Sequence, residues 1–223
     1  MQQYKHIRLY SDTEFNSAGG ELISAALVSV CGERWYEACL TDAPVHYWPK
    51  AFVIPHLGVE QKTKQEMAKS FQKFMSRFDQ VTIVVDQKAD AKHFADLICH
   101  MNKPDQLINF EFAKPTAVVK HHSKTPHNAL SDAICFMELL LGSKEVDERG
   151  VSPWSVYSEL DKRGIPLNLG NSKFEVVDQT TNGDFVVEVF PISDGGERAK
   201  RWKFTDYFHQ VGVYRLTVAP QGN

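Results

Sequence analysis

The chain has 223 residues, a formal net charge of −3, 43% hydrophobic residues and 24% charged residues. This ordinary globular composition suits one large domain or a medium domain plus a small one, and no apolar run approaches the ~20 residues that a membrane helix requires. A slightly negative chain does not attract nucleic acid through its overall charge, so a polyanionic substrate must be held locally. The N-terminus lacks an apolar signal region and the cysteines form no Cys-x-x-Cys pair, so we expect a cytoplasmic protein without a disulfide framework or zinc knuckle.

Residues 7–15 predict a strand that ends by presenting two carboxylates, Asp12 and Glu14. Side chains two residues apart share one face of a strand, so these two acids repel each other. The arrangement costs stability unless a cation neutralises it, and hard divalent ions with oxygen ligands, Mg²⁺ or Mn²⁺, are the natural partners. An isolated Asp-x-Glu is also common in exposed turns, so the interpretation depends on the residues that follow.

Two further strands are expected at residues 21–30 and 34–40, which form an antiparallel meander with the first strand. Residues 41–57 contain prolines at three positions, so we expect a loop with at most short turns. The aromatic side chains of this loop are expected to pack onto the sheet: Tyr47, Trp48 and Phe52.

The next part of the chain alternates helices and strands. Residues 63–78 place apolar side chains at intervals of three and four, which predicts an amphipathic helix. Residues 81–85 are nearly all β-branched, which is typical of a strand covered on both faces. A helix at 90–101, a strand at 107–112 and a long helix at 125–141 complete the pattern. The sequence therefore predicts an α/β fold in which helices flank both sides of a mixed five-stranded sheet.

Two acidic residues follow the buried strand, and either is a candidate ligand. Asp90 is expected at the start of the next helix, at the carboxyl edge of the sheet, where α/β folds place their sites. An aspartate at a helix N-terminus is also an ordinary cap. Asp86, at the very end of the strand, competes with Asp90 for the same task.

The long helix carries a histidine and an aspartate. Thr125 is expected as its N-cap and Pro126 in its first position, which places His127 in the first turn. Asp132 follows five residues later, and apolar residues stand three, four and seven positions beyond it. A carboxylate in apolar surroundings is costly unless it is paired or binds a metal. His127 taken alone is also consistent with an exposed residue beside the other histidines of this region.

Four segments carry a resemblance to a known family. They are Asp-Thr-Glu-Phe at 12–15, Glu-Leu-Ile-Ser at 21–24, the strand-to-helix junction at 86–90, and the His-x-Ala-x-x-Asp-Ala pattern at 127–133. Together they resemble the DEDDh group of 3′ to 5′ exonucleases, related to the proofreading subunit of bacterial replicative polymerase and to small bacterial and phage exoribonucleases. The resemblance covers roughly residues 5–142 and implies an RNase H-like fold.

The junction departs from the usual form of the family. The family has Asn where Asp86 stands, and often an aromatic residue where Ala89 stands. Asp90 is therefore the first choice for the middle acid, and Asp86 remains the second choice.

The resemblance implies hydrolysis of phosphodiester bonds with two metal ions. Asp12 would bridge two Mg²⁺ or Mn²⁺ ions, and Glu14 and Asp132 would complete the site on the side of the nucleophile. Asp90 would hold the second ion. His127 would be the general base, because a histidine with an ordinary pKa of about 6.5 accepts a proton at neutral pH.

The expected substrate is a single-stranded 3′ end of RNA or DNA. RNA is mildly preferred, because the opening Asp-Thr-Glu-Phe with its short following turn resembles the exoribonuclease members. Phe15 would stack on the terminal base, as the family implies, or else pack in the core. Lys120 and Lys124 flank the histidines and are candidates for phosphate contacts, although most loop lysines are simply solvated.

A polar, Gly-bounded stretch at 142–150 predicts a linker, so we expect an exonuclease domain at 1–143 and a small α+β module at 151–223. The basic cluster at 198–203, which includes Arg201, is the kind of feature that binds a nucleic-acid backbone, but a charged loop explains it equally well. The module is a candidate for binding substrate, a protein partner or a second copy of the chain. Its expected elements are one short helix and four strands: 154–162, 173–177, 185–190, 202–208 and 213–218.

Two other functions remain open from the sequence alone. A proofreading or repair DNA exonuclease, docked on a partner through the C-terminal module, would use the same catalytic residues. A catalytically inactive nucleic-acid-binding adaptor of the same fold is the alternative from a different class. The sequence speaks against lost activity, because every expected catalytic position carries a competent side chain.

Overall fold

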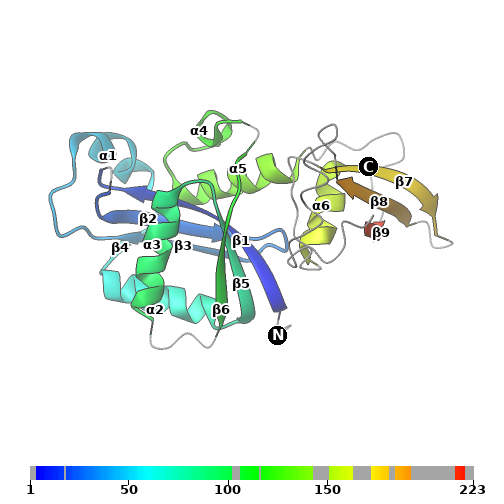
Figure 1. Cartoon of the computed structure of the whole chain (residues 1–223). Coiled ribbons are helices and arrows are strands. Elements are labelled where there is room, and N and C mark those ends of the chain that lie inside the picture. Colours follow the sequence, from blue (N-terminus) through cyan, green and yellow to red (C-terminus); the bar gives the residue numbers. More distant parts are fainter. Residues whose placement is uncertain are drawn as a thin grey trace, which may run out of the picture. The chain divides into compact units, whose positions relative to one another are not determined.

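The computed structural model (Figure 1) describes residues 4–17, 19–101, 106–115, 117–142, 151–162, 172–180, 184–191 and 214–218. The chain divides into two compact units, Met1–Leu140 and Leu141–Asn223. Among the described residues, no helix combines the length and the apolar character of a bilayer-spanning segment.

The first unit is built on a mixed sheet of six strands in the order β4-β3-β2-β1-β5-β6 (Figure 1). Neighbouring strands of the β1-β2-β3 meander are antiparallel, whereas β5 pairs in parallel with both β1 and β6. The predicted α/β fold with a mixed sheet and flanking helices is therefore confirmed. The strand bounds are Tyr4–Phe15 (β1), Leu22–Val28 (β2), Arg34–Cys39 (β3), Gln61–Lys62 (β4), Phe78–Val85 (β5) and Leu107–Phe112 (β6).

The sheet has one strand more than the five that the sequence predicts. The additional strand, β4, has two residues and pairs in parallel with the end of β3. The backbone N–H of Leu40 extends this pairing by donating to the carbonyl of Lys62 at 2.8 Å. Two residues are too few to show the alternation of apolar and polar side chains that marks a strand in a sequence.

The two helices predicted at 63–78 and 90–101 begin within two residues of the predicted positions, and the one predicted at 125–141 begins four residues late. The helices at Tyr47–Phe52 and Val119–His122 were not predicted, the first because 41–57 was expected to be a loop with at most short turns. Thr63 caps α2 through a capping box, because its hydroxyl accepts from the Glu66 N–H at 3.3 Å while the Glu66 carboxylate accepts from the Thr63 N–H at 2.9 Å. The bounds are Tyr47–Phe52 (α1), Lys64–Met75 (α2), Lys88–Cys99 (α3), Val119–His122 (α4) and Ala129–Leu141 (α5), with a 3₁₀ helix, η1, at Ile54–His56.

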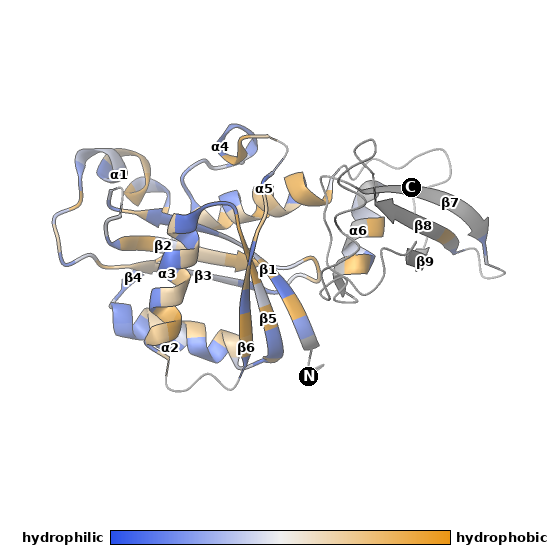
Figure 2. Ribbon diagram, in the orientation of Figure 1, coloured by the Kyte–Doolittle hydropathy of each residue, from blue (hydrophilic) through white to orange (hydrophobic). Residues whose placement is uncertain are grey.

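Helices cover both faces of the sheet. On one face, α2 and α3 share an apolar core cluster with the strands, in which Leu9 and Phe71 are fully buried. On the other face, Phe136 of α5 meets the ring of Tyr10 at 6.2 Å between centroids. Leu9 and Tyr10 serve opposite faces because successive side chains alternate along a strand. In Figure 2, α2 carries both hydrophilic and hydrophobic colours, as expected for a helix with one buried side.

The region 41–57 differs from the prediction in the placement of its aromatic residues. They were expected to pack onto the sheet, but Tyr47, Trp48 and Phe52 are 84%, 46% and 46% exposed. The buried residue of α1 is Pro49, and the apolar cluster beneath this region uses the aliphatic side chains of Val53 and Leu57 instead. The prediction was therefore wrong, because the smaller residues fill the space over the sheet and the aromatic ones are left on the surface.

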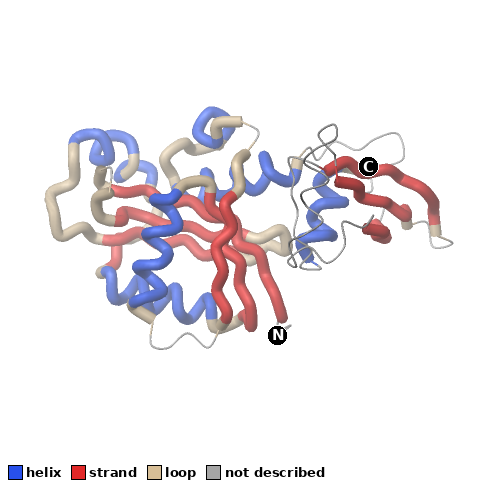
Figure 3. The backbone as a smooth tube through the Cα atoms, viewed as in Figure 1, coloured by secondary structure: helices blue, strands red, loops and turns tan. Residues whose placement is uncertain are grey.

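The described residues of the second unit form one helix and an antiparallel sheet in the order β7-β8-β9 (Figure 3). These described elements coincide, within a few residues, with a predicted helix and three predicted strands. The predicted strand at 202–208 and the basic cluster with Arg201 lie outside the described residues. The bounds are Pro153–Lys162 (α6), Ser172–Gln179 (β7), Phe185–Pro191 (β8) and Tyr214–Val218 (β9).

Candidate metal centre

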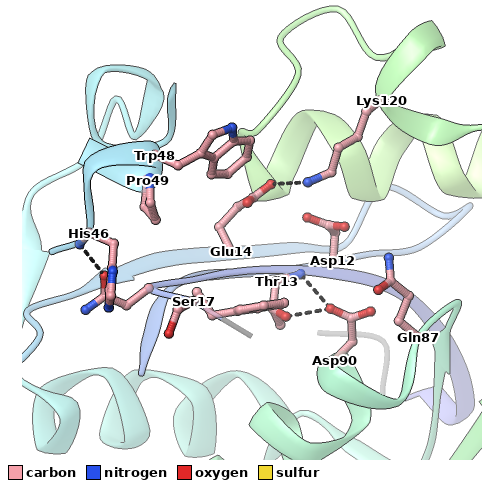
Figure 4. Close-up of a pocket in the computed structure, with 12 residues that line it drawn as sticks. Asp12, Thr13, Glu14, Ser17, His46, Trp48, Pro49, Gln87, Asp90 and Lys120 are labelled. Atoms are coloured by element: carbon pink, nitrogen blue, oxygen red, sulfur yellow. Dashed lines mark hydrogen bonds and ion pairs between the residues drawn. The ribbon is translucent and has the colours of Figure 1, made fainter. Parts of the chain in front are cut away.

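Asp12 and Glu14 stand near the end of β1 and point to the same side of the strand, as their spacing predicts (Figure 4). Glu14 is 4% exposed. The Oδ2 atom of Asp12 is buried and finds no hydrogen-bond partner within the described part of the chain. A buried carboxylate oxygen without a partner is unfavourable, because it has lost water and gained nothing in exchange.

Asp132 reaches the same point from the first turn of α5. Its side chain is fully buried, and its Oδ2 atom accepts from the backbone N–H of His127 at 3.1 Å. Its other oxygen, Oδ1, has no hydrogen-bond partner among the described residues. One carboxylate oxygen from each of Asp12, Glu14 and Asp132 lies within 4.8 Å of the others. These three carboxylates could hold a metal ion, since ligand oxygens at about 2.0–2.6 Å from a divalent cation stand at such separations from one another.

Asp90 lies on the other side of β1 from Glu14 and is bound to the strand itself. Its Oδ1 atom accepts from the backbone N–H of Thr13 at 3.1 Å and from the Thr13 hydroxyl at 2.5 Å (Figure 4). Asp90 is therefore no helix cap; Gln87 is the N-cap residue of α3, and its side chain makes no capping bond. Asp90 lines a pocket together with Asp12, whereas Asp86 is not among the residues that line this pocket.

The four carboxyl groups are electrostatically unfavourable together in the absence of a cation. Burial, followed by the charges of Glu14, Asp90 and Asp132, raises the pKa of Asp12 well above its ordinary value. Burial also raises the pKa of Glu14 and of Asp132, and it raises the pKa of Asp90 to about 7. Asp90 is therefore partly protonated near neutral pH, and a bound cation would favour the charged form of all four groups.

Lys120 places a cationic group within hydrogen-bond distance of this cluster. Its Nζ atom donates to Glu14 Oε1 at 3.2 Å and lies 3.1 Å from Nδ1 of His127. Burial lowers the pKa of His127, and the positive charge of Lys120 lowers it further. The neutral form of the imidazole is therefore favoured.

His127 does not stand in the first turn of a helix, as the sequence predicts, because α5 begins only at Ala129. Asn128 provides the cap instead of Thr125: its Oδ1 atom accepts from the Ser131 N–H at 3.0 Å. His127 just precedes this cap with a φ of 65°, and it is the only non-glycine residue with positive φ in the described part of the chain. The sequence pattern misplaced the start of the helix because Pro126 suits a turn as well as a first helical position.

A side-chain network fixes the segment that carries His127. The Nδ2 atom of Asn128 donates to the carbonyl of His56 at 2.6 Å and to the hydroxyl of Tyr36 at 3.1 Å. The Tyr36 hydroxyl in turn donates to the carbonyl of Leu57 at 2.7 Å. Burial raises the pKa of Tyr36 to about 12, so this hydroxyl stays a donor at all ordinary pH values. The sequence offered no signal for this network, because its members are far apart in the chain.

The pocket beside the carboxylates has a volume of about 380 Å³, and Lys120 contributes to its wall. Trp48 also lines it and packs edge-to-face on the ring of His127 at 4.7 Å between centroids. Phe15 lines the pocket and packs on the ring of His93 at 5.3 Å between centroids, and its stacking on a terminal base stays a prediction. Lys124, the other predicted phosphate contact, is exposed and does not line the pocket. Arg201 lies outside the described residues.

The sequence did not place Trp48 in the pocket, because its side chain was expected to pack onto the sheet. Lys120 was named only together with Lys124, as a candidate for phosphate contacts. An exposed tryptophan next to a proline in a polar loop was the available signal for Trp48, whereas nothing local separates the two lysines. A search of protein-family models and of curated proteins finds no match to this sequence, so the geometry of this carboxylate pocket is the basis for assigning a function.

Proposed function

We propose that the protein is a metal-dependent 3′ to 5′ exonuclease that hydrolyses phosphodiester bonds at single-stranded nucleic-acid ends. The observation that carries this proposal is the convergence of Asp12, Glu14 and Asp132 within 4.8 Å of one another, next to the imidazole of His127, whose Nδ1 atom lies 3.8 Å from Glu14 Oε1. Buried like charges from two distant segments destabilise a fold unless a cation joins them. A proton acceptor beside such a site suits hydrolysis.

The residues present fit Mg²⁺ or Mn²⁺. All ligands are carboxylate oxygens, which are hard donors, and no thiol or imidazole belongs to the cluster among the described residues. Asp12, Glu14 and Asp132 would hold one ion. Asp12 and Asp90 would hold a second, because Asp90 lines the same pocket and its buried Oδ2 atom has no partner among the described residues. Such ions lower the pKa of water and neutralise the charge that develops on phosphate oxygens.

The remaining groups of the pocket would bind and orient the substrate. His127 would accept a proton from the attacking water, as its lowered pKa and its position next to Asp132 permit. Trp48 and Phe15 present aromatic rings to the pocket, and unpaired bases stack on such rings with little dependence on sequence. A volume of about 380 Å³ is at the low end for small-ligand pockets, which favours a chain end over a duplex.

The fold supports the same proposal. An antiparallel meander whose first strand carries the acids, followed by two strands parallel to that first strand, agrees with the RNase H-like fold that the resemblance implies. The parallel strand β5 ends just before Asp86, so the loop that follows leads α3 and Asp90 to the acidic end of β1. Sites of α/β folds lie at this edge of a sheet.

The decisive experiment follows two single strands of equal sequence, one RNA and one DNA, each labelled at the 5′ end. Wild-type protein with Mn²⁺ is expected to shorten them from the 3′ end in a ladder, and EDTA or Asp12→Asn is expected to abolish the ladder. Asp96→Asn, an exposed carboxylate on α3, is the matched control and should retain activity. The strand that shortens faster identifies the preferred sugar. Binding without shortening would instead support the inactive adaptor, and internal cuts would exclude an exonuclease.

A further inference from the structure

Lys120 contacts both a predicted metal ligand and the predicted general base of the candidate site. Its ammonium group contacts Glu14, a predicted metal ligand, at 3.2 Å and His127, the predicted base, at 3.1 Å. Glu14 and His127 are themselves close, with 3.8 Å between Oε1 and Nδ1. A single ammonium group therefore contacts both the acid and the base, and its positive charge partly offsets the negative charge of Glu14.

The backbone of Lys120 is held firmly against α5. The Cys135 thiol donates to the carbonyl of Val119 at 3.5 Å, and the hydroxyls of Ser123 and Ser131 are 2.9 Å apart. Val119 is 8% exposed and anchors the short helix α4. The side chain of Lys120, in contrast, is 37% exposed. It can therefore turn outward into solvent without any change in the core.

The contact with Lys120 determines which nitrogen of His127 carries the proton. A lysine ammonium group has three donors and no acceptor, so Nδ1 of His127 must accept in this contact. The proton of the neutral ring is then on Nε2, and neither nitrogen is left to accept another proton. As long as Lys120 stays in place, His127 cannot be a general base.

We propose that Lys120 is an internal counter-cation of the acidic site, which a divalent ion displaces, and that this displacement frees His127 to accept a proton. The proposal rests on the proposed function, since it assigns roles to the same ligands and base. A divalent ion held by Glu14 repels the ammonium group and takes over its contact with the carboxylate. Lys120 then leaves Nδ1, whose lone pair becomes available, while the proton on Nε2 stays where it is. Lys120 is thus a positioning residue that links occupation of the metal site to the state of the base.

The first test measures Mn²⁺ binding by titration calorimetry at pH 8 for wild type, Lys120→Met and Lys120→Arg. Removal of the competing charge is expected to lower the apparent dissociation constant of Lys120→Met roughly tenfold, which corresponds to about 1.4 kcal/mol. Lys120→Arg keeps the charge and should bind Mn²⁺ like the wild type. Lys73→Met, an exposed lysine on α2, is the control for a change of net charge. Equal or weaker binding by Lys120→Met overturns the proposal even if the wild type is an active nuclease.

A second readout uses the ring nitrogens of His127 in ¹⁵N-labelled wild-type protein. Without metal, Nδ1 should give the shift of an unprotonated nitrogen and Nε2 that of a protonated one. Mg²⁺, which is diamagnetic, is expected to shift the Nδ1 resonance as Lys120 leaves, whereas Lys120→Met should show a mixture of tautomers even without Mg²⁺. A protonated Nδ1 in the metal-free wild type would contradict the proposal. If neither Mn²⁺ nor Mg²⁺ binds any of the proteins, the proposed function fails together with it.

Discussion

The two faces of β1 differ in the kind of side chains that they bury near the end of the strand. On the face covered by α2 and α3, the core cluster is apolar, and rings such as Phe71 and Phe94 pack at 6.1 Å between centroids, while Asp90 is buried only at the strand end, against Thr13. On the other face, near the end of the strand, Asp12 and Asp132 each keep a buried oxygen without a hydrogen-bond partner among the described residues. The apolar core cluster stabilises the fold, and the buried acids at the strand end destabilise it.

The largest expected change in the free energy of unfolding comes from the apolar core cluster. Phe71→Ala removes a fully buried ring from the contacts with Trp35 and Phe94, and it should lower the free energy of unfolding by about 3–5 kcal/mol. Urea denaturation measures this change, and calorimetry on the folded variant should give an unchanged Mn²⁺ affinity. A large change in Mn²⁺ affinity would show that the core and the acidic site are not independent.

Binding of a divalent metal ion should offset the loss of stability that the buried carboxylates at the end of β1 cause. Mn²⁺ at about 100 times its dissociation constant is expected to raise the free energy of unfolding of the wild type by about 2.7 kcal/mol, because it binds only the folded state. Asp12→Asn removes the central ligand and should lose most of this gain, while its metal-free form should be at least as stable as the wild type. Equal stabilisation of both proteins in urea denaturation with Mn²⁺ would place the metal elsewhere.

A pH series isolates the contribution of Asp90. Its folded pKa of about 7 is far above that of an unfolded aspartate, about 3.9, so the stability that the neutral form contributes is complete below about pH 4 and is lost as the pH rises from there to about 7. In metal-free protein, Asp90→Asn should therefore match the wild type near pH 3, gain on it as the pH rises to about 7, and exceed it by at least about 2 kcal/mol near pH 8. Histidines with lowered pKa values act in the opposite direction, but they are common to both proteins and cancel in the difference. A difference that does not grow with pH would refute this assignment.

The smallest effect on folding is expected at the surface of the pocket. Trp48→Ala should change the free energy of unfolding by less than about 0.5 kcal/mol, since the ring is 46% exposed. In the inactive Asp12→Asn background it should weaken binding of a single-stranded oligonucleotide by about 1–3 kcal/mol, measured by fluorescence anisotropy. Tyr47→Ala, on the same helix but not in the pocket wall, is the control. Equal losses in both variants would mean that Trp48 contributes no specific stacking.

The parts of the fold that the sequence predicts well depend on local periodicity. The spacing of Asp12 and Glu14 correctly put both on one face of β1, and the β-branched run before Asp86 marked the buried strand β5. The parts that it misses depend on packing between distant segments. The exposure of Trp48 follows from smaller residues filling the space beneath α1, and the position of Lys120 follows from the docking of α4 on α5. Neither of these two features produces a periodic pattern in the sequence.

At position 127, the backbone conformation and the proposed chemistry favour different residues. A φ of 65° is a conformation that glycine adopts freely and that costs other residues about 1–2 kcal/mol. The fold by itself would favour glycine there, whereas the proposed proton transfer requires an imidazole. If His127 has the proposed role, selection for heat resistance alone should tend to replace it and yield more stable molecules that lack the proposed activity, so a stabilised version would have to be evolved under a simultaneous requirement for turnover.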